Sequence, residues 1–524
     1  MNYRSTRVLK ALIFLLLISF LFKCSNKKEH RRPNVIFIAI DDLRPELGCY
    51  GNEEIITPNF DRLASEGMLF TKAYCQVAVC APSRASIMTG LRPDSSRVWV
   101  LGDSFRKNMP DVVTIPQHFK KFGYHTVSIG KIFHNHMPDS VSFDEPDLRP
   151  AEYSTPDMVD RDAESFYYDD EIKKEHALVR EERIKKNPNR ARYGGGWAYG
   201  RSVEIADAKD DELYDGAQTV LAIEKLKELK DKDEPFFLAL GYYRPHLPFV
   251  APKKYWDLYD PEKLSMPSNN YQPKDAPVMA INTPYELTGC YDLEYVKHPT
   301  ISSLSPDSAR LLRHGYYASV SYVDALLGKL MDAIKEMKLD DNTIIVVWGD
   351  HGWKLGEHNG WSKMTNYEID IRVPLIVKAP GISPKGKSNG LVELVDVYST
   401  LCDLAGIDIP TYLQGTSFKP LLENPDREWK SAAFSQFQRR PRESIDGQNY
   451  MGYSMITDRY HYVEWYGWDQ TNKEVLDFAA TELYDLQNDP EENTNMANQI
   501  DKKELLDQLS KQLKRGWKNA QPNI

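Results

Sequence analysis

Residues 34–42 read NVIFIAIDD, a continuous apolar run that ends in two aspartates. A run of this kind, rich in β-branched residues and without polar alternation, is typical of a parallel strand buried on both faces. Four further segments have the same character, namely residues 125–129, 236–241, 343–348 and 374–378. Because helix-like stretches lie between these segments, the sequence predicts an α/β fold with a large, mainly parallel sheet flanked by helices.

The clearest helix-like stretch covers residues 308–337. Its apolar residues recur at intervals of three and four positions from Tyr316 onward, which is the spacing of a helix that packs one face on a sheet. A shorter helix is predicted from Pro58 to Ser65, with Gly67 as its stop.

The composition is that of a large globular protein. Of the 524 residues, 41% are hydrophobic and 27% are charged, which excludes a disordered chain. The net charge of −10 argues against nucleic acid as a partner. An anionic substrate would therefore depend on a local basic pocket. The six cysteines show neither the spacing of a disulfide scaffold nor that of a zinc site.

The N-terminus has the order of an export signal. Basic residues precede an apolar run over residues 11–22, which is too short to span a bilayer comfortably. Cys24 follows this run and resembles the lipidated cysteine of bacterial lipoproteins. We therefore predict a signal peptide over residues 1–23, and a lipid-anchored protein in the periplasm or on the cell surface of a bacterium. Lys23 departs from the lipoprotein pattern, so plain secretion and an uncleaved anchor stay open.

Two parts of the exported chain differ in pattern. Residues 32–425 carry the strand–helix alternation and form the predicted main domain, with a charged surface insertion at about residues 137–205. Residues 426–524 contain short alternating segments, such as 460–465, and a polar helix over 502–515. These features predict a C-terminal α+β subdomain with a small antiparallel sheet and a helix.

Acidic side chains follow two of the predicted strands directly. Asp41 and Asp42 come after residue 40, and Asp350 and His351 come after the strand at 343–348. In an open α/β sheet, ligands bind beyond the carboxyl ends of the strands. Because neighbouring carboxylates repel each other, a hard cation such as Ca²⁺ or Mg²⁺ is favoured there. A single aspartate in such a place more often only caps a helix or turn.

A second stretch, CAPSRASIMTG at residues 80–90, predicts a helix. Pro82 fits the first turn and Gly90 fits the stop. Cys80 then lies at the helix N-terminus, where backbone N–H groups attract anions, with Arg84 one turn away. A cysteine taken alone is more often a buried structural residue.

The five residues CAPSR at 80–84 are similar to the Cys-x-Pro-Ser-Arg signature of type I sulfatases. The stretches DDLRPELGCYG at 41–51, GKIFH at 130–134, GYYRPHLPF at 241–249 and DHGWKLGEH at 350–358 resemble the iduronate-2-sulfatase branch of that family. The resemblance covers nearly the whole mature chain. It implies an alkaline-phosphatase/sulfatase-like fold and the hydrolysis of sulfate esters on sugars.

In this family the cysteine is converted to formylglycine (3-oxoalanine) by a formylglycine-generating or sulfatase-maturating enzyme. One hydroxyl of the hydrated aldehyde attacks sulfur and releases the alcohol. The second hydroxyl then loses its proton and expels sulfate, which restores the aldehyde. The resemblance implies Ca²⁺, with Mg²⁺ as the second choice, on a ligand set formed by Asp41, Asp42, Cys80, Asp350 and His351.

The resemblance also assigns roles around the sulfate. It implies that Arg84 holds the diol, that Lys131 and His134 help to activate it, and that His246 and Lys363 bind sulfate and protonate the leaving oxygen. The residues alone do not choose between His134 and the nearby His136.

The resemblance implies that Arg44 and Trp353 lie near the sugar, and Arg244 is a third candidate for binding the substrate. The basic run at 439–442 reads as solvated surface in preference to a further subsite for a polyanion. The implied substrates are uronic-acid-containing glycans, either 2-sulfated iduronate of glycosaminoglycans or an algal polymer such as ulvan.

Two other functions stay open at this point. One is a phosphodiesterase or phosphonate hydrolase of the same superfamily, which shares the fold. The other is a lipoprotein that binds sulfated glycans without turnover because Cys80 is never oxidised.

Overall fold

The computed structural model describes residues 32–134, 137–150, 167–187, 200–382 and 386–522. Its central sheet has seven strands in the order β13-β2-β12-β8-β1-β6-β4. The bounds of these strands are Gly386–Ser388, Met68–Phe70, Leu375–Lys378, Thr343–Gly349, Asn34–Ile40, Phe236–Tyr242 and His125–Gly130.

The predicted mainly parallel sheet is confirmed. Strand β1 pairs in parallel with β6 and β8, and β4 pairs in parallel with β6. Strand β12 runs antiparallel to both of its neighbours, β8 and β2. The chain leaves β8 at the carboxyl end of that strand and enters β12 at the same end of the sheet. Because no crossover connection lies between them, β12 runs antiparallel to β8.

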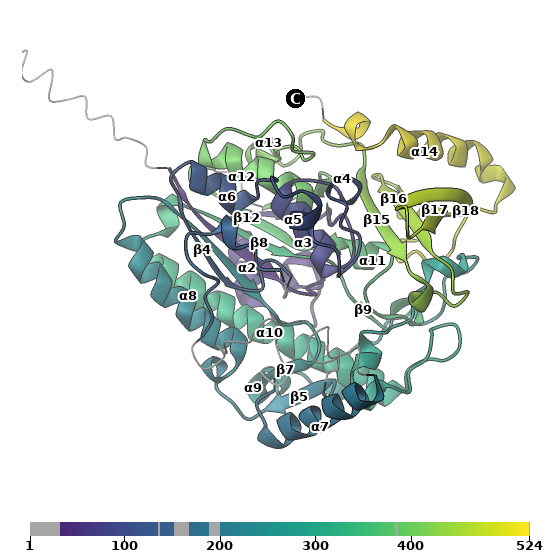
Figure 1. Ribbon diagram of the computed structural model, residues 1–524, viewed down its shortest axis with the longest axis horizontal. Helices are drawn as coiled ribbons and strands as arrows, with labels where there is room; N and C mark the ends of the chain where they lie inside the picture. The colour runs from purple at the N-terminus through teal and green to yellow at the C-terminus, as the bar shows by residue number, and fades with distance from the viewer. Residues whose placement is uncertain (1–31, 135–136, 151–166, 188–199, 383–385, 523–524) are drawn as a thin grey trace, which may run out of the picture.

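The side chains of β1 alternate between two hydrophobic cores. Ile36, Ile38 and Ile40 pack with helices α2 (Pro58–Glu66), α8 (Tyr214–Lys230) and α10 (Pro306–Glu336). Residues Val35 and Phe37 face the opposite core, which contains α3 (Cys80–Thr89), α6 (Ile115–Lys121) and α12 (Val397–Ala405). Figure 1 shows these two helical layers on either side of the sheet. A strand covered on both faces needs no polar alternation, which explains its sequence.

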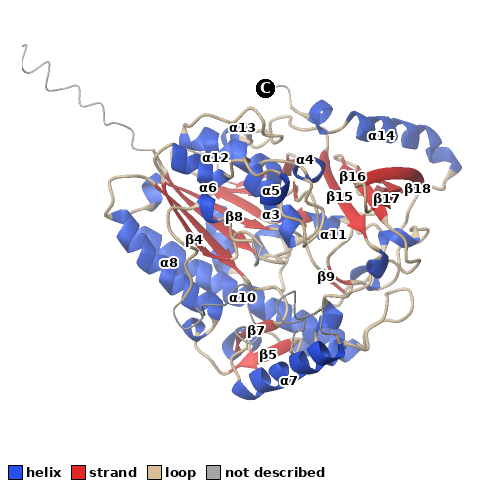
Figure 2. Cartoon of the chain, in the orientation of Figure 1, coloured by secondary structure: helices blue, strands red, loops and turns tan. Residues whose placement is uncertain are grey.

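A separate antiparallel sheet follows near the C-terminus (Figure 2). Its strands are β15 (Ala433–Arg439), β16 (Tyr450–Ile456), β17 (Tyr460–Asp469) and β18 (Glu474–Asp485). Helix α14 (Lys503–Arg515) packs on it through Leu509. The predicted small sheet with a helix is thus confirmed, whereas the domain boundaries stay predictions.

Within the predicted insertion, the structure describes helix α7 (Asp170–Lys186) and strand β5 (Val203–Ala206), which pairs with β7 (Phe249–Pro252). The remainder of the insertion lies outside the described residues, as do the predicted signal peptide and Cys24. Among the helices that are described, none combines the length and the apolar character that a bilayer crossing requires.

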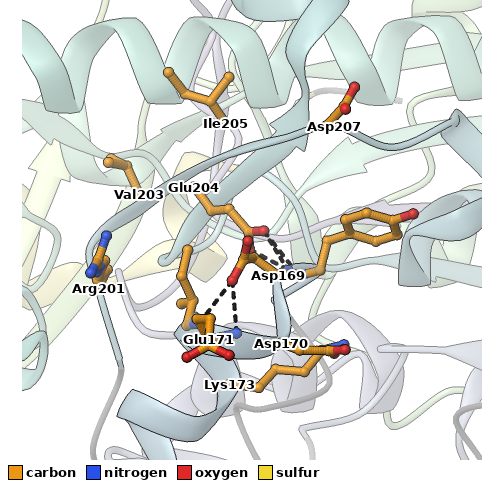
Figure 3. Close-up of a pocket in the computed structure, with 11 residues that line it drawn as sticks. Asp169, Asp170, Glu171, Lys173, Arg201, Val203, Glu204, Ile205 and Asp207 are labelled. Carbon is orange, nitrogen blue, oxygen red and sulfur yellow. Dashed lines mark hydrogen bonds and ion pairs between the residues drawn. The ribbon is translucent and has the colours of Figure 1, made fainter.

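A hollow lies beside α7, and acidic side chains line it (Figure 3). Two of these carboxylates accept hydrogen bonds from backbone N–H groups. Asp169 accepts hydrogen bonds from the N–H groups of Glu171 and Ile172 at 2.8 and 3.1 Å, which caps the helix. Glu204 accepts from the N–H groups of Tyr168 and Asp169 at 2.9 and 2.8 Å. Asp169 and Glu204 therefore hold the start of α7 in place, and we assign the hollow no catalytic role.

Candidate active site

The site forms where β1 and β8 end side by side. Ile40 is level with Gly349 in the parallel register of these strands. The residues that follow, Asp41 with Asp42 and Asp350 with His351, are therefore brought together at the carboxyl edge, as the sequence predicts.

These four side chains are completely buried. The Nε2 atom of His351 lies 3.4 Å from Oδ1 of Asp42 and 3.6 Å from Oδ1 of Asp350. Ligand atoms of Asp41, Cys80, Asp350 and His351 all lie within 4.8 Å of one another. The second carboxylate oxygen of Asp42, Oδ2, is buried and accepts no hydrogen bond. A buried carboxylate oxygen of this kind is a strong reason to expect a cation.

Cys80 is the first residue of α3, and Gly90 ends that helix in a left-handed conformation with φ of 67°. The predicted position of Cys80 at a helix N-terminus is confirmed. Its Sγ atom lies 3.2 Å from Nε2 of His351. Burial, followed by the nearby charge of Asp41, raises the pKa of the Cys80 thiol well above its ordinary value. An unmodified thiol at this position is thus protonated at neutral pH and is a poor nucleophile.

Arg84 connects α3 to the acidic cluster. Its guanidinium is 1% exposed and donates to Oδ2 of Asp350 at 2.8 Å and to Oδ1 of Asp41 at 3.4 Å. It also donates to the backbone carbonyls of Lys131 and Ile132. Arg84 therefore fixes the two acids relative to the helix that carries Cys80.

Lys131 follows β4 and donates to the carboxylate of Asp41. Burial on its own raises the pKa of Asp41, but Lys131, His246 and Arg84 lower it well below its usual range. His134 lines a small cavity together with Arg84 and Phe133, whereas His136 lies outside the described residues.

His246 and Lys363 approach the cluster from the other side. The Nζ atom of Lys363 donates to Oδ1 of Asp42 at 2.7 Å, and Nε2 of His246 lies 3.9 Å from Oδ2 of Asp42. Burial lowers the pKa of His246, but the carboxylates of Asp42 and Asp41 outweigh it and raise that pKa above its ordinary value. The two predicted sulfate-binding residues are thus adjacent, although 117 positions separate them in the chain.

Glu286 is a further residue of this site, and the sequence does not predict it. This carboxylate is 4% exposed and accepts from Lys363 at 2.9 Å and from His246 at 3.1 Å. It lies in a segment of short 3-10 turns that has no periodicity or motif. No local signal in the sequence marks it.

The three residues predicted to bind the sugar have different surroundings. Arg44 is paired with Glu46 and Glu357 and donates to the backbone carbonyl of Trp353 at 3.1 Å. The Trp353 ring lies under Nζ of Lys363, which is 4.9 Å from its centroid. Arg244 is buried and donates to the carbonyls of Val250 and His246, so in this structure it braces the loop of His246.

The predicted solvated surface at residues 439–442 is wrong for Arg439. This side chain is fully buried and donates to the carbonyls of Met279 and Ala280 at 2.9 and 3.3 Å. A run of basic residues reads as surface from composition alone. Here the first of them lies at the end of β15, where the small sheet meets the loop before Glu286.

Residues 33–407 match the family described as Sulfatase. The chain belongs to the sulfatase family. The C-terminal part, residues 356–519, also matches a family described as N-sulphoglucosamine sulphohydrolase, C-terminal. The predicted membership is thereby confirmed, and this sulfatase is a sulfuric ester hydrolase.

Two relatives match along most of their length. This sulfatase is 33% identical to iduronate 2-sulfatase of Homo sapiens, in an alignment that covers 89% of this chain and 91% of the human protein. It is 32% identical to a sulfatase of Formosa agariphila, which covers 96% of this chain and 91% of that protein. The predicted resemblance to the iduronate-2-sulfatase branch is confirmed.

Solved structures share the fold. One was determined in complex with its substrate D-glucosamine-2-N,6-O-disulfate; the TM-score is 0.69 and the identity 23%, over 93% of this chain and 99% of that chain. Another is a phosphonate monoester hydrolase of Agrobacterium radiobacter, with a TM-score of 0.67 and 22% identity over 92% and 95% of the two chains. The alkaline-phosphatase/sulfatase-like architecture is confirmed.

Proposed function

We propose that this sulfatase removes sulfate esters from uronic-acid-containing glycans, and that it uses a formylglycine made from Cys80. The observation that carries the proposal is the placement of residue 80 at the start of α3, 3.2 Å from His351 and one helical turn before Arg84, which is ion-paired with Asp350. The similarity to an iduronate 2-sulfatase supports 2-sulfated iduronate of glycosaminoglycans as a substrate. An ulvan-type algal polymer presents related chemistry and is the second candidate.

The residues of the acidic cluster fit a hard divalent cation, with Ca²⁺ proposed before Mg²⁺. Asp41, Asp42, Asp350 and His351 offer oxygen-rich ligands around the position of residue 80, and Oδ2 of Asp42 lacks a hydrogen-bond donor. When bound, the cation would neutralise the carboxylates and polarise the sulfate oxygens.

The side chains of this chain have separate tasks in the proposed reaction. Lys131 and Arg84 supply fixed positive charge on the α3 side of the site. His246 and Lys363 supply positive charge on the opposite side of the site. They are the proposed proton donors to the leaving oxygen of the sugar. Nδ1 of His246 is occupied by the carbonyl of Leu247 at 2.6 Å, so Nε2 is the atom that faces the site. The role of His134 beside Lys131 stays a prediction.

A mass measurement tests the modification directly. The tryptic peptide from Ala73 to Arg84 contains Cys75 and Cys80. In protein from its own host, treated with a thiol-alkylating reagent, we expect an aldehyde at Cys80 and an alkylated thiol at Cys75. Two intact thiols in this peptide would contradict the catalytic proposal and favour a protein that only binds glycans.

Rate comparisons test the ester that is cleaved. The enzyme should hydrolyse 4-nitrophenyl sulfate faster than the corresponding phosphate and phosphonate esters. The reverse order would favour the phosphonate hydrolase function. A panel of 2-sulfated iduronate disaccharides and ulvan oligosaccharides then separates the two candidate sugars.

Export and a lipid anchor at Cys24 are also proposed. With Cys24→Ala, the protein should move from the membrane fraction to the soluble exported fraction, because the acyl chains hold the protein on the bilayer. Fractionation of the host followed by an immunoblot measures this. Retention of the variant in the membrane would instead indicate an uncleaved anchor.

A further inference from the structure

Glu286 contacts both His246 and Lys363 and has no part in the mechanism proposed above. Oε1 of Glu286 accepts from Lys363 at 2.9 Å and lies 3.1 Å from Nε2 of His246. We propose that Glu286 is a positioning residue: it holds these two cations together beside the sulfate, and when the substrate binds, the Nε2 proton of His246 that Glu286 accepts here passes to the leaving oxygen. This inference rests on the roles proposed above for His246 and Lys363.

The loop that carries Glu286 is tied down on two sides. Asn282 donates from Nδ2 to the backbone carbonyl of Lys363 at 2.6 Å, which ties the loop to the backbone of that lysine. The N–H of Thr283 donates to the carbonyl of Glu443 at 3.1 Å, and Arg439 holds the carbonyl of Met279 at 2.9 Å. The small C-terminal sheet therefore helps to place Glu286 in the site.

The charges explain why a carboxylate is needed at this position. Lys363 and His246 repel each other when both are protonated, and burial strengthens that repulsion. A shared carboxylate oxygen between them offsets the repulsion. Burial on its own raises the pKa of Glu286, but Lys363 and His246 lower it to about 2, so Glu286 is ionised at neutral pH. Without it, among the residues that the structure describes, Asp42 at 2.7 Å is the carboxylate that stays ion-paired with Lys363.

The variant Glu286→Gln tests this role because glutamine keeps the shape of the side chain and removes its charge. The second oxygen of Glu286, Oε2, has no hydrogen-bond partner, so an amide nitrogen fits in its place without opposing a donor. Loss of a negative charge alone should tighten the binding of an anion. Loss of positioning should weaken it. The sign of the change therefore separates the two effects.

The first measurement is a calorimetric titration of inorganic sulfate into the purified, metal-loaded wild type and Glu286→Gln. We expect the variant to bind sulfate about fivefold more weakly. Tighter or unchanged binding would overturn the proposal. Thermal unfolding of both proteins shows whether the variant is folded.

The second measurement compares esters with different leaving groups. A good leaving group needs little protonation, so we expect Glu286→Gln to lower kcat/KM for 4-nitrophenyl sulfate by less than about threefold and that for phenyl sulfate by about 30-fold. An equal loss on both esters would indicate a purely structural role. If the wild type hydrolyses neither ester nor any sulfated sugar, the proposed function fails, and the sulfate titration still decides the role of Glu286.

Asp292→Asn is the matched control. This acid lies in the next 3-10 turn and accepts from the N–H and the hydroxyl of Ser202 at 3.0 and 2.7 Å. Its loss should lower stability without changing the ratio of the two esters. A change in that ratio as large as in Glu286→Gln would assign the effect to the loop in general and overturn the specific role of Glu286.

Discussion

With Cys80→Ala, kcat/KM for any sulfate ester should fall by at least about 10⁴-fold, because the variant lacks the group from which the attacking nucleophile is made. The fold should survive. Cys80 is a small residue at the first position of α3, and alanine is well tolerated in a helix. His246 and Lys363, the residues proposed to bind sulfate, both remain, so binding of sulfate should be retained.

Initial rates with 4-nitrophenyl sulfate, with calorimetry of sulfate binding beside them, measure this effect. Cys75→Ala is a matched control, because Cys75 is also a buried thiol and lies five residues before Cys80. The control should keep most of its activity. Substantial turnover by Cys80→Ala would refute the assignment of the nucleophile.

Asp350→Asn should lower kcat/KM by about 10²- to 10³-fold and should weaken the binding of the cation. Asp350 carries several interactions at once. Its Oδ2 accepts from Arg84 at 2.8 Å, and its Oδ1 accepts from the backbone N–H of Asp42 at 3.1 Å. Removing its charge leaves the buried Arg84 undercompensated and takes one anionic ligand from the proposed cation site.

Calcium titrations after treatment with a chelator test this expectation. The wild type should lose activity on chelation and regain it with Ca²⁺, and Asp350→Asn should need far more Ca²⁺ for half-maximal recovery. Asp332→Asn is a suitable control, because Asp332 is paired with Arg62 on the outer face of α10. An unchanged calcium dependence in Asp350→Asn would contradict its role as a ligand.

Much of the fold follows from local patterns. The strand at residues 34–40 and the helix at residues 306–336 were predicted within a few positions, because burial on two faces and on one face leave different spacings of apolar residues. The C-terminal sheet was predicted in the same way. The antiparallel direction of β12 was not predicted, because a buried strand has the same composition in either direction.

The sequence by itself determined the fold class, the family and the residues that follow strands β1 and β8. These features depend on short stretches, in which spacing and order carry the information. Only the tertiary structure showed that Glu286 joins His246 to Lys363 and that Arg439 is buried against the loop before it. Such contacts link residues that lie 40 to about 160 positions apart. Whether a charged side chain lies on the surface or in a site depends on its partners in space. Its neighbours in the sequence do not decide this, so no local pattern reveals such contacts.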